Sequence, residues 1–301
     1  MACNELSIFT KPVCLIYSDD NRHLCIKEEV LKEIGSLNQA FHIVTITGLC
    51  RTGKSYLMNR LADVKKAFPL GSSIESQTKG IWVLCRAHPE YKNDILILMD
   101  TEGLGDIEKG DMNHDNCILA LAVLLSSTLI YNILGTMRDN DLQMLSYVAE
   151  VCRQITTAED KAGVDVDVFC PMLVLTLRDF ALELIKDGSS ITTDIYLNDF
   201  CLKTLHGSGE KERCYNETRQ CIEKYFKRRK CFTFDRPGDR TTLQNLETKE
   251  DSELSADFIR DSKQFVEYVL KQNHPKRLDP ERTLTGSSMF ISILLTLSCL
   301  C

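Results

Sequence analysis

The octapeptide GLCRTGKS at residues 48–55 fits the pattern G-x-x-x-x-G-K-[ST] of a phosphate-binding loop. Glycines in such a loop let backbone N–H groups turn toward phosphate oxygens at the start of a helix. We therefore expect a nucleotide's phosphates to lie against Gly48, Thr52 and Gly53, with Lys54 reaching the β- and γ-phosphates. The hydroxyl of Ser55 is the expected magnesium ligand.

The residues on both sides of this loop favour a nucleotide site over a glycine-rich turn that binds nothing. The β-branched run FHIVTIT at residues 41–47 predicts a strand that ends at the first glycine, and KSYLMNRLADV at residues 54–64 has helical spacing. Strand, glycine loop and helix thus follow one another, as a phosphate-binding loop requires. Tyr56, in the first helical turn, completes the residues that we expect near the phosphates.

A carboxylate that could bind magnesium stands at the end of a second apolar run. DILILMD at residues 94–100 predicts a buried strand that ends at Asp100, and TEG comes next. We expect Asp100 to hold the magnesium ion and Gly103 to offer a backbone N–H that senses the γ-phosphate. Asp-x-x-Gly alone is most often a turn, so the interpretation depends on the buried strand and the phosphate-binding loop before it.

A third magnesium ligand is expected between these two motifs. In many nucleotide hydrolases a threonine there completes the metal shell when a γ-phosphate is present, and Thr78 is the best candidate. An ordinary polar loop is the alternative interpretation of this segment. Three nearby serines compete with Thr78 on spacing alone: Ser72, Ser73 and Ser76.

The remaining apolar patterns predict an α/β fold of the P-loop NTPase class, with a mostly parallel central sheet and helices on both faces. Ligands then bind at the carboxyl ends of the strands. Further strands are expected in an edge hairpin within residues 12–26, near residues 128–133, at 171–177 and at 231–235. Helices are expected at residues 27–39, over the run that begins at residue 117, and at residues 255–273.

Composition narrows the class of protein. The chain has 301 residues, 44% of them apolar and 26% charged, which is typical of a globular protein. A net charge of −7 argues against a nucleic-acid partner. Fourteen cysteines are scattered without C-x-x-C pairs or zinc spacing, and no signal peptide is evident, so we expect buried thiols and a reducing, cytoplasmic location.

Five blocks of the sequence resemble the guanylate-binding proteins, interferon-inducible large GTPases of the dynamin superfamily. They are GLCRTGKSYLMNRL, SQTKGIWVLC, LMDTEGLGDIEKGD, ALAVLLSSTLIYN and LTLRDF, in consistent order between about residue 14 and about residue 285. The resemblance implies a large GTPase domain of extended Ras-like topology at residues 1–285, followed by a divergent apolar tail at residues 286–301. It implies hydrolysis of GTP to GDP with magnesium, and in this family on to GMP.

The resemblance also implies how the base is recognised. The N-K-x-D motif of small GTPases is missing after the phosphate-binding loop, and Thr176-Leu177-Arg178-Asp179 resembles the family's T-[LV]-R-D motif. Arg178 and Asp179 would then bind guanine, with Asp179 accepting hydrogen bonds from its N1 and N2 donors. Adenine offers no such donors, so the discrimination can be large. A surface pair between Arg178 and Asp179 is the alternative.

The catalytic residues that the resemblance implies are Arg51, Lys54, Ser76 and Glu102. Arg51 matches the family's arginine finger, which moves onto the phosphates of its own chain when two GTPase domains meet. Such an arginine can raise the rate by about three to five orders of magnitude. Ser76 matches a serine that positions the attacking water, and Glu102 matches a glutamate that shapes the water and proton network. A solvated loop residue is the alternative for Arg51.

Partners and biology also follow from the resemblance alone. It implies a homodimer, or a heterodimer with other guanylate-binding proteins, and a role in interferon-linked innate immunity. A guanine cap beyond CFTFDRP would contain Arg236 and Arg240. Two other functions stay open. One is a catalytically weak module that binds guanine nucleotide and regulates longer relatives by heterodimerisation. The other is an enzyme for another nucleotide, against which the T-L-R-D motif argues.

The sequence departs from the family pattern in three places. Cys50 stands where an aromatic residue is common, and Gln77 stands where a histidine is common. The family continues into a long helical region, so functions that need it, such as assembly on pathogen membranes, are not expected from this sequence. The apolar run at residues 289–301 is too short to span a bilayer and is no C-a-a-X box. We expect it to pack on the domain or to be a divergent end, with lipidation and peripheral membrane or vesicle association as the alternative.

Overall fold

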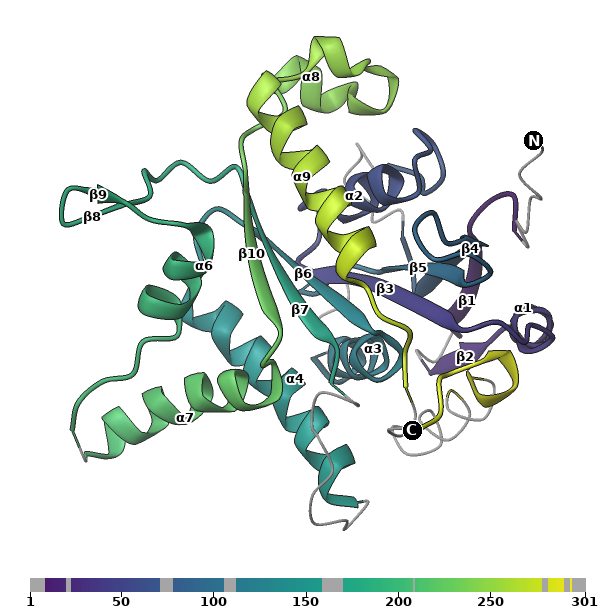
Figure 1. The fold of residues 1–301 in the computed structure, drawn as a ribbon, viewed down its shortest axis with the longest axis horizontal. Coiled ribbons are helices and arrows are strands. Elements are labelled where there is room, and N and C mark those ends of the chain that lie inside the picture. The colour runs from purple at the N-terminus through teal and green to yellow at the C-terminus, as the bar shows by residue number, and fades with distance from the viewer. Residues whose placement is uncertain are drawn as a thin grey trace.

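The computed structural model describes residues 9–19, 23–70, 78–105, 112–158, 170–207, 209–277, 281–289 and 293. Its centre is an eight-stranded sheet in the order β10-β7-β6-β3-β5-β4-β1-β2 (Figure 1). In chain order its strands are β1 Val13–Ser18, β2 Leu24–Ile26, β3 Phe41–Gly48, β4 Ile81–Ala87, β5 Ile95–Thr101, β6 Thr128–Leu134, β7 Met172–Arg178 and β10 Arg229–Phe234.

The expected sheet is confirmed. Strands β10, β7, β6, β3 and β5 pair in parallel, and β4, β1 and β2 extend the sheet in antiparallel pairs. β3, β5 and β7 are buried along their whole length, which explains their continuous apolar runs. A separate small hairpin joins β8 Ile185–Lys186 to β9 Ser189–Ser190.

Helices cover both faces of the sheet (Figure 1). On one side α2 packs against α9, and on the other α4 packs against α7, with two separate apolar clusters between the layers. The main helices are α1 Glu28–Gly35, α2 Lys54–Leu61, α3 Met112–Leu125, α4 Asp139–Ala158, α7 Glu210–Tyr225 and α9 Ala256–Gln272. The short ones are α6 Thr193–Ile195, the π-helix η1 Tyr196–Cys201, α8 Arg240–Gln244, η2 Leu246–Thr248 and η3 Asp251–Glu253.

The sequence pattern did not predict strand β4. It follows Thr78 in the segment between the two nucleotide-binding motifs, and residues 81–87 pair with β5 on one side and with β1 on the other. The helices α4 and α7 were also missed. The expected hairpin, the helices near residues 27–39, 54–64, 117 and 255–273, and all other expected strands are present.

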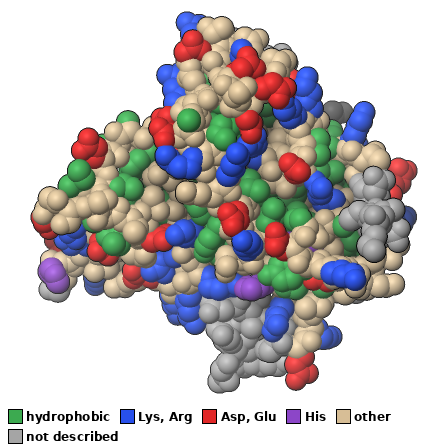
Figure 2. Space-filling view, turned by 45° about the horizontal axis from the view of Figure 1, so that its top comes forward, with side chains coloured by type: hydrophobic (Ala, Val, Ile, Leu, Met, Phe, Trp, Pro, Cys, Tyr) green, Lys and Arg blue, Asp and Glu red, His purple; other side chains and the backbone are tan. Residues whose placement is uncertain are grey.

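The apolar tail, the helix lengths and the surface charges bear on the expected membrane and nucleic-acid partners. Met289 and Ile293, in the apolar tail, are fully buried in the core, so at these positions the tail packs on the domain. No helix in the described part of the chain is both long and apolar enough to cross a bilayer. On the face shown in Figure 2, basic and acidic side chains are interspersed.

Candidate nucleotide-binding site

The phosphate-binding loop connects the central strand β3 to helix α2. Gly48, at the end of β3, has φ +135°, and a Cβ there would overlap the carbonyl oxygen of Asn132. Gly53 takes the left-handed conformation with φ +83° and comes directly before α2. Both positions therefore require glycine, and the loop directs the first N–H groups of α2 toward the carboxyl ends of the strands.

Lys54 and Thr52 are held inside this loop. Lys54 is only 7% exposed, and its Nζ donates to the carbonyl oxygen of Leu49 at 3.0 Å. The Thr52 hydroxyl donates to the same oxygen at 2.8 Å. Burial lowers the pKa of Lys54, and the nearby Asp100 carboxylate partly opposes that shift. The lysine thus brings a buried positive charge to the middle of the loop.

The three expected magnesium ligands lie together. Ser55 Oγ donates to Asp100 Oδ2 at 2.6 Å, and Thr78 Oγ1 lies 3.5 Å from both of these atoms. Burial raises the pKa of Asp100 to about 6, while the hydrogen bond from Ser55 and the charge of Lys54 oppose the rise. Two hydroxyls and one carboxylate, from three separate segments, therefore meet beside the buried lysine.

These residues fit a magnesium ion. Asp100 is 1% exposed, and its Oδ1 is buried without a hydrogen-bond partner among the described residues. An acceptor that is buried and unpaired costs about 1–3 kcal/mol, which a cation or an ordered water would recover. The described residues contain no group of three or more His, Cys, Asp or Glu side chains placed to hold a metal. One carboxylate with two hydroxyls suits magnesium, which takes its other ligands from water and phosphates.

The loop after β5 is hydrogen-bonded to the phosphate-binding loop. Cys50 N donates to Leu104 O, and Leu104 N donates to Gly48 O, both at 3.1 Å. A Cβ on Gly103 would lie 2.5 Å from the Cα of Cys50 and closer still to its Sγ. Close packing of the two loops is therefore enough to require glycine at position 103. The expected role of Gly103 in sensing the γ-phosphate would be a second reason.

Glu102 is buried and has partners for both oxygens. Its Oε2 accepts from Gly80 N at 2.6 Å, and its Oε1 contacts Nε2 of His114 within hydrogen-bond distance. Sequence reasoning missed His114, because its place near Glu102 depends on how helix α3 packs. Ser76, the other residue expected to position water, lies outside the described residues.

At the end of β7, Arg178 and Asp179 point to different neighbours. Arg178 is 4% exposed, its guanidinium lies 5.0 Å from the Phe234 ring, and its Nη2 lies 3.6 Å from where a Cβ on Gly53 would be. Its Nε and Nη1 are buried without partners in the described part of the chain. Burial lowers the pKa of Arg178 to about 10. Arg178 is therefore no surface residue, and the alternative of a surface pair is wrong for it.

Asp179 has the more open position. It takes the left-handed backbone conformation with φ +54°, and its side chain is 35% exposed. Oδ2 lies 4.0 Å from Nε of Arg236, one of the two arginines expected in the guanine cap. The other, Arg240, is exposed at the start of α8. A partly exposed carboxylate beside the carboxyl end of β7 is accessible to a base.

Two expected nucleotide-binding side chains do not reach into the site. Arg51 is exposed, has φ +61°, and makes no hydrogen bond or ion pair with any described residue. The ring of Tyr56 is buried and packs against Phe258 of α9, with the ring centroids 5.6 Å apart. Arg51 thus has room to move, whereas Tyr56 contributes to the core.

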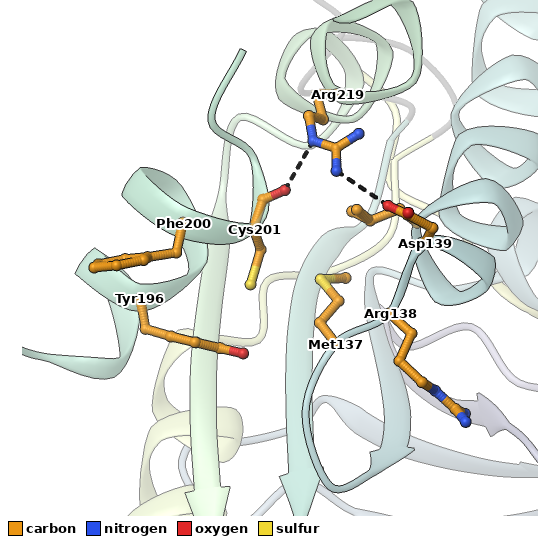
Figure 3. Close-up of a pocket in the computed structure, with 8 residues that line it drawn as sticks. Met137, Arg138, Asp139, Tyr196, Phe200, Cys201 and Arg219 are labelled. Carbon is orange, nitrogen blue, oxygen red and sulfur yellow. Dashed lines mark hydrogen bonds and ion pairs between the residues drawn. The ribbon is translucent and has the colours of Figure 1, made fainter. Parts of the chain in front are cut away.

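A hollow lies apart from these residues, at the start of α4 and beside η1 (Figure 3). Its volume is about 160 Å³. Arg219 lines it and donates to Cys201 O at 3.1 Å and to Asp139 Oδ1 at 3.3 Å, so its charge already has partners (Figure 3). The lining residues are Met137, Arg138, Asp139, Leu142, Tyr196, Phe200, Cys201 and Arg219.

Comparison with known proteins gives the family. The family model described as "Guanylate-binding protein, N-terminal domain" matches residues 21–278, most of the chain. The chain belongs to the guanylate-binding protein family. It is 44% identical to guanylate-binding protein 1 of Homo sapiens over 279 residues, which is 89% of this chain and 46% of that protein. It is 42% identical to guanylate-binding protein 1 of Mus musculus over 298 residues, which is 97% of this chain and 50% of that protein.

The match is to one part of those relatives. Guanylate-binding protein 1 of Chlorocebus aethiops is 44% identical over 275 residues, again 89% of this chain and 46% of that protein. The chain therefore spans about half the length of the curated relatives it matches. The resemblance to guanylate-binding proteins stated from five sequence blocks is confirmed, and the matched region contains every described residue of the site.

Proposed function

We propose that this chain binds GTP with magnesium and hydrolyses it to GDP, and in part to GMP. The observation that carries the proposal is the meeting of Ser55, Thr78 and Asp100 beside Lys54, with one oxygen of Asp100 buried and unpaired. Membership of the guanylate-binding protein family supports the choice of guanine.

Each part of the site has a separate task in this proposal. The N–H groups at the start of α2 and the Lys54 ammonium hold the phosphates, the lysine giving up its contact with Leu49 O. Asp179 accepts hydrogen bonds from the guanine edge, and Arg178 carries positive charge behind Gly53. Ser55, Thr78 and Asp100 hold the ion. Magnesium, when bound, neutralises charge on the β- and γ-phosphate oxygens.

The proposal includes activation by dimerisation, with Arg51 as the finger. Its exposure and its lack of described partners leave the side chain able to swing onto the phosphates when a second GTPase domain covers the loop. Its left-handed backbone supports a functional role, since a non-glycine residue with positive φ stores strain of about 1 kcal/mol or more. The second domain belongs to another copy or to a longer guanylate-binding protein.

The experiment is GTP turnover by the purified chain over at least a tenfold range of protein concentration, with GDP and GMP resolved. Arg51→Ala is compared with Arg153→Ala, a control on the exposed face of α4 where the arginine pairs with Glu150. We expect specific activity to rise with concentration and to fall about a thousandfold in Arg51→Ala alone. GTP binding with equally slow turnover in all three proteins would instead support the catalytically weak, heterodimerising module.

The setting of this activity is part of the proposal. We place it in the cytoplasm, within interferon-linked innate defence, because the family is associated with that response. Peripheral association with membranes or vesicles is the alternative. Fractionation of interferon-treated cells tests the location, and recovery of the chain in the membrane pellet after a salt wash would favour the alternative.

A further inference from the structure

Glu102 is held between two segments that are far apart in the sequence. On one side, Gly80 N donates to its Oε2 at 2.6 Å, and Glu102 N donates back to Gly80 O at 2.8 Å. On the other side, Nε2 of His114 contacts its Oε1. The side chains of His114 and Glu102 are 5% and 1% exposed, so water does not compete strongly for this contact.

We propose that His114 is a positioning residue for the nucleotide site, acting through Glu102 on the segment that carries Thr78. This inference rests on the proposed GTPase function. Without the contact from His114, one oxygen of a buried carboxylate would lack that hydrogen bond, and the side chain would turn toward water or another donor. Turning the carboxylate breaks its bond to Gly80 N.

Gly80 is also packed closely on its other side. Its φ is +74°, and a Cβ there would overlap the carbonyl oxygen of Ile16, so β1 packs closely against it. Thr78 lies two residues earlier and contacts both Ser55 and Asp100 at 3.5 Å. In this proposal the bond from Gly80 N to Glu102 therefore helps to set the position of the start of β4, and with it the distance of Thr78 from the metal ligands.

Helix α3 offers a matched control one residue away. Asp115 accepts from Gly105 N at 2.7 Å, so it also ties the first turn of α3 to the loop after β5. That contact is exposed and does not involve Glu102. A purely structural role for the first turn of α3 would make Asp115 and His114 equivalent, whereas the proposed role makes only His114 affect Gly80.

The test compares four variants of the full chain: His114→Leu, His114→Gln, His114→Asn and Asp115→Leu, the last of which cannot accept from Gly105 N. A glutamine amide places its N–H near the position of the histidine Nε2, while an asparagine amide reaches only the Nδ1 position. Glutamine should therefore restore the contact to Glu102, and asparagine should not. Thermal unfolding of each variant identifies any loss of activity that is due to a loss of fold.

Two quantities are measured. The first is the exchange rate of the Gly80 amide hydrogen, which we expect to rise about tenfold or more in His114→Leu and His114→Asn. The second is GTP turnover at saturating nucleotide, which we expect to fall about ten- to a hundredfold in the same two variants, with GTP affinity changed less than about threefold. His114→Gln should stay close to the unmodified protein in both, and Asp115→Leu should leave the exchange of Gly80 unchanged.

The two readouts separate this inference from the proposed function. Unchanged Gly80 exchange in His114→Leu overturns the inference, whatever the turnover. If the unmodified protein is active and His114→Leu turns over GTP equally fast, the inference is also overturned. An equal rise of Gly80 exchange in Asp115→Leu overturns it as well. If the unmodified protein shows no turnover, the hydrolysis proposal fails by itself. Gly80 exchange and the magnesium dependence of GTP affinity then decide whether His114 positions the Thr78 segment.

Discussion

The two ends of the central strands bury polar groups in different ways. At the carboxyl ends, Asp100 Oδ1 and two nitrogens of Arg178 are buried without partners among the described residues. At the amino ends, His42 is fully buried, and its Nε2 and Nδ1 lie 2.8 Å from Asp94 Oδ2 and Asn273 O. One end thus has charged groups in need of a ligand, and the other has a buried side chain whose two ring nitrogens already have partners from the chain.

An unpaired atom alone does not separate the two ends. His88 Nε2 and Asn273 Nδ2, at the amino ends, are also buried without described partners. The carboxyl ends differ because their unpaired atoms belong to the charged side chains of Asp100 and Arg178, whereas those at the amino ends belong to a histidine ring and an amide. Asp100 accepts a hydrogen bond from Ser55, and Arg178 lies beside Gly53, so the unpaired charge adjoins the phosphate-binding loop.

The largest effect is expected from Asp100→Asn. The amide cannot supply the negative charge that holds magnesium, so GTP affinity in the presence of magnesium should fall by about 100-fold or more, about 3 kcal/mol. The free energy of unfolding without nucleotide should stay the same or rise by about 1 kcal/mol, since burial already disfavours the charged carboxylate. Binding of a fluorescent GTP analogue and urea unfolding measure the two quantities.

The same kind of substitution at the other end of β5 should lower the free energy of unfolding and leave GTP affinity nearly unchanged. Asp94→Asn leaves the buried His42 without its carboxylate, which should lower the free energy of unfolding by about 1–3 kcal/mol. GTP affinity should change less than about threefold, because Asp94 lies at the far end of the strand. If Asp94→Asn weakens GTP binding as much as Asp100→Asn does, the division between the two ends is wrong.

The sequence predicted the carboxyl ends better than the amino ends. Phosphate binding needs a fixed spacing within one loop, so residues 48–55 and the carboxylate at the end of β5 were found from pattern alone. His42, Asp94 and Asn273 are brought together from three distant segments, and no local spacing shows that they meet. His114 was missed for the same reason.

The missed elements have similar causes. α7 buries only Arg219, Ile222 and Tyr225 among its sixteen residues, so it has no apolar stripe for a pattern to detect. β4 is a short apolar run, which periodicity cannot assign to a strand or a helix. The central parallel strands were predictable because both of their faces are covered.

A pH effect should appear at the amino ends. Burial, and then the charge of His42, lower the pKa of His88 from 6.5 to about 3, and His88 Nδ1 accepts from Glu90 N and Tyr91 N. Between pH 6.5 and about pH 3, His88 is therefore protonated in the unfolded chain and neutral in the folded chain. The free energy of unfolding then falls as the pH drops below 6.5. Between pH 7 and pH 5 this group should remove about 2 kcal/mol from the free energy of unfolding.

His88→Asn tests this assignment. The asparagine oxygen can keep the role of Nδ1 as acceptor but does not titrate in this range. Urea unfolding at pH 5, 6 and 7 should therefore show a pH dependence that is smaller by about 2 kcal/mol than in the unmodified protein. An identical pH dependence in the two proteins would mean that another group takes up the proton.

The smallest effect is expected from an ion pair on α2, the helix that begins at the phosphate-binding loop. Arg60, near the end of α2, makes two hydrogen bonds to Asp251 of η3, at 2.6 and 3.0 Å, with side chains 22% and 44% exposed. Because both groups are partly hydrated, a double-mutant cycle of Arg60→Ala and Asp251→Ala should give a coupling energy of about 0.5–1 kcal/mol that falls with added salt. GTP affinity should not change by more than about threefold. If either substitution changes GTP affinity more than this, a place on α2 affects nucleotide binding even where the charge already has a partner.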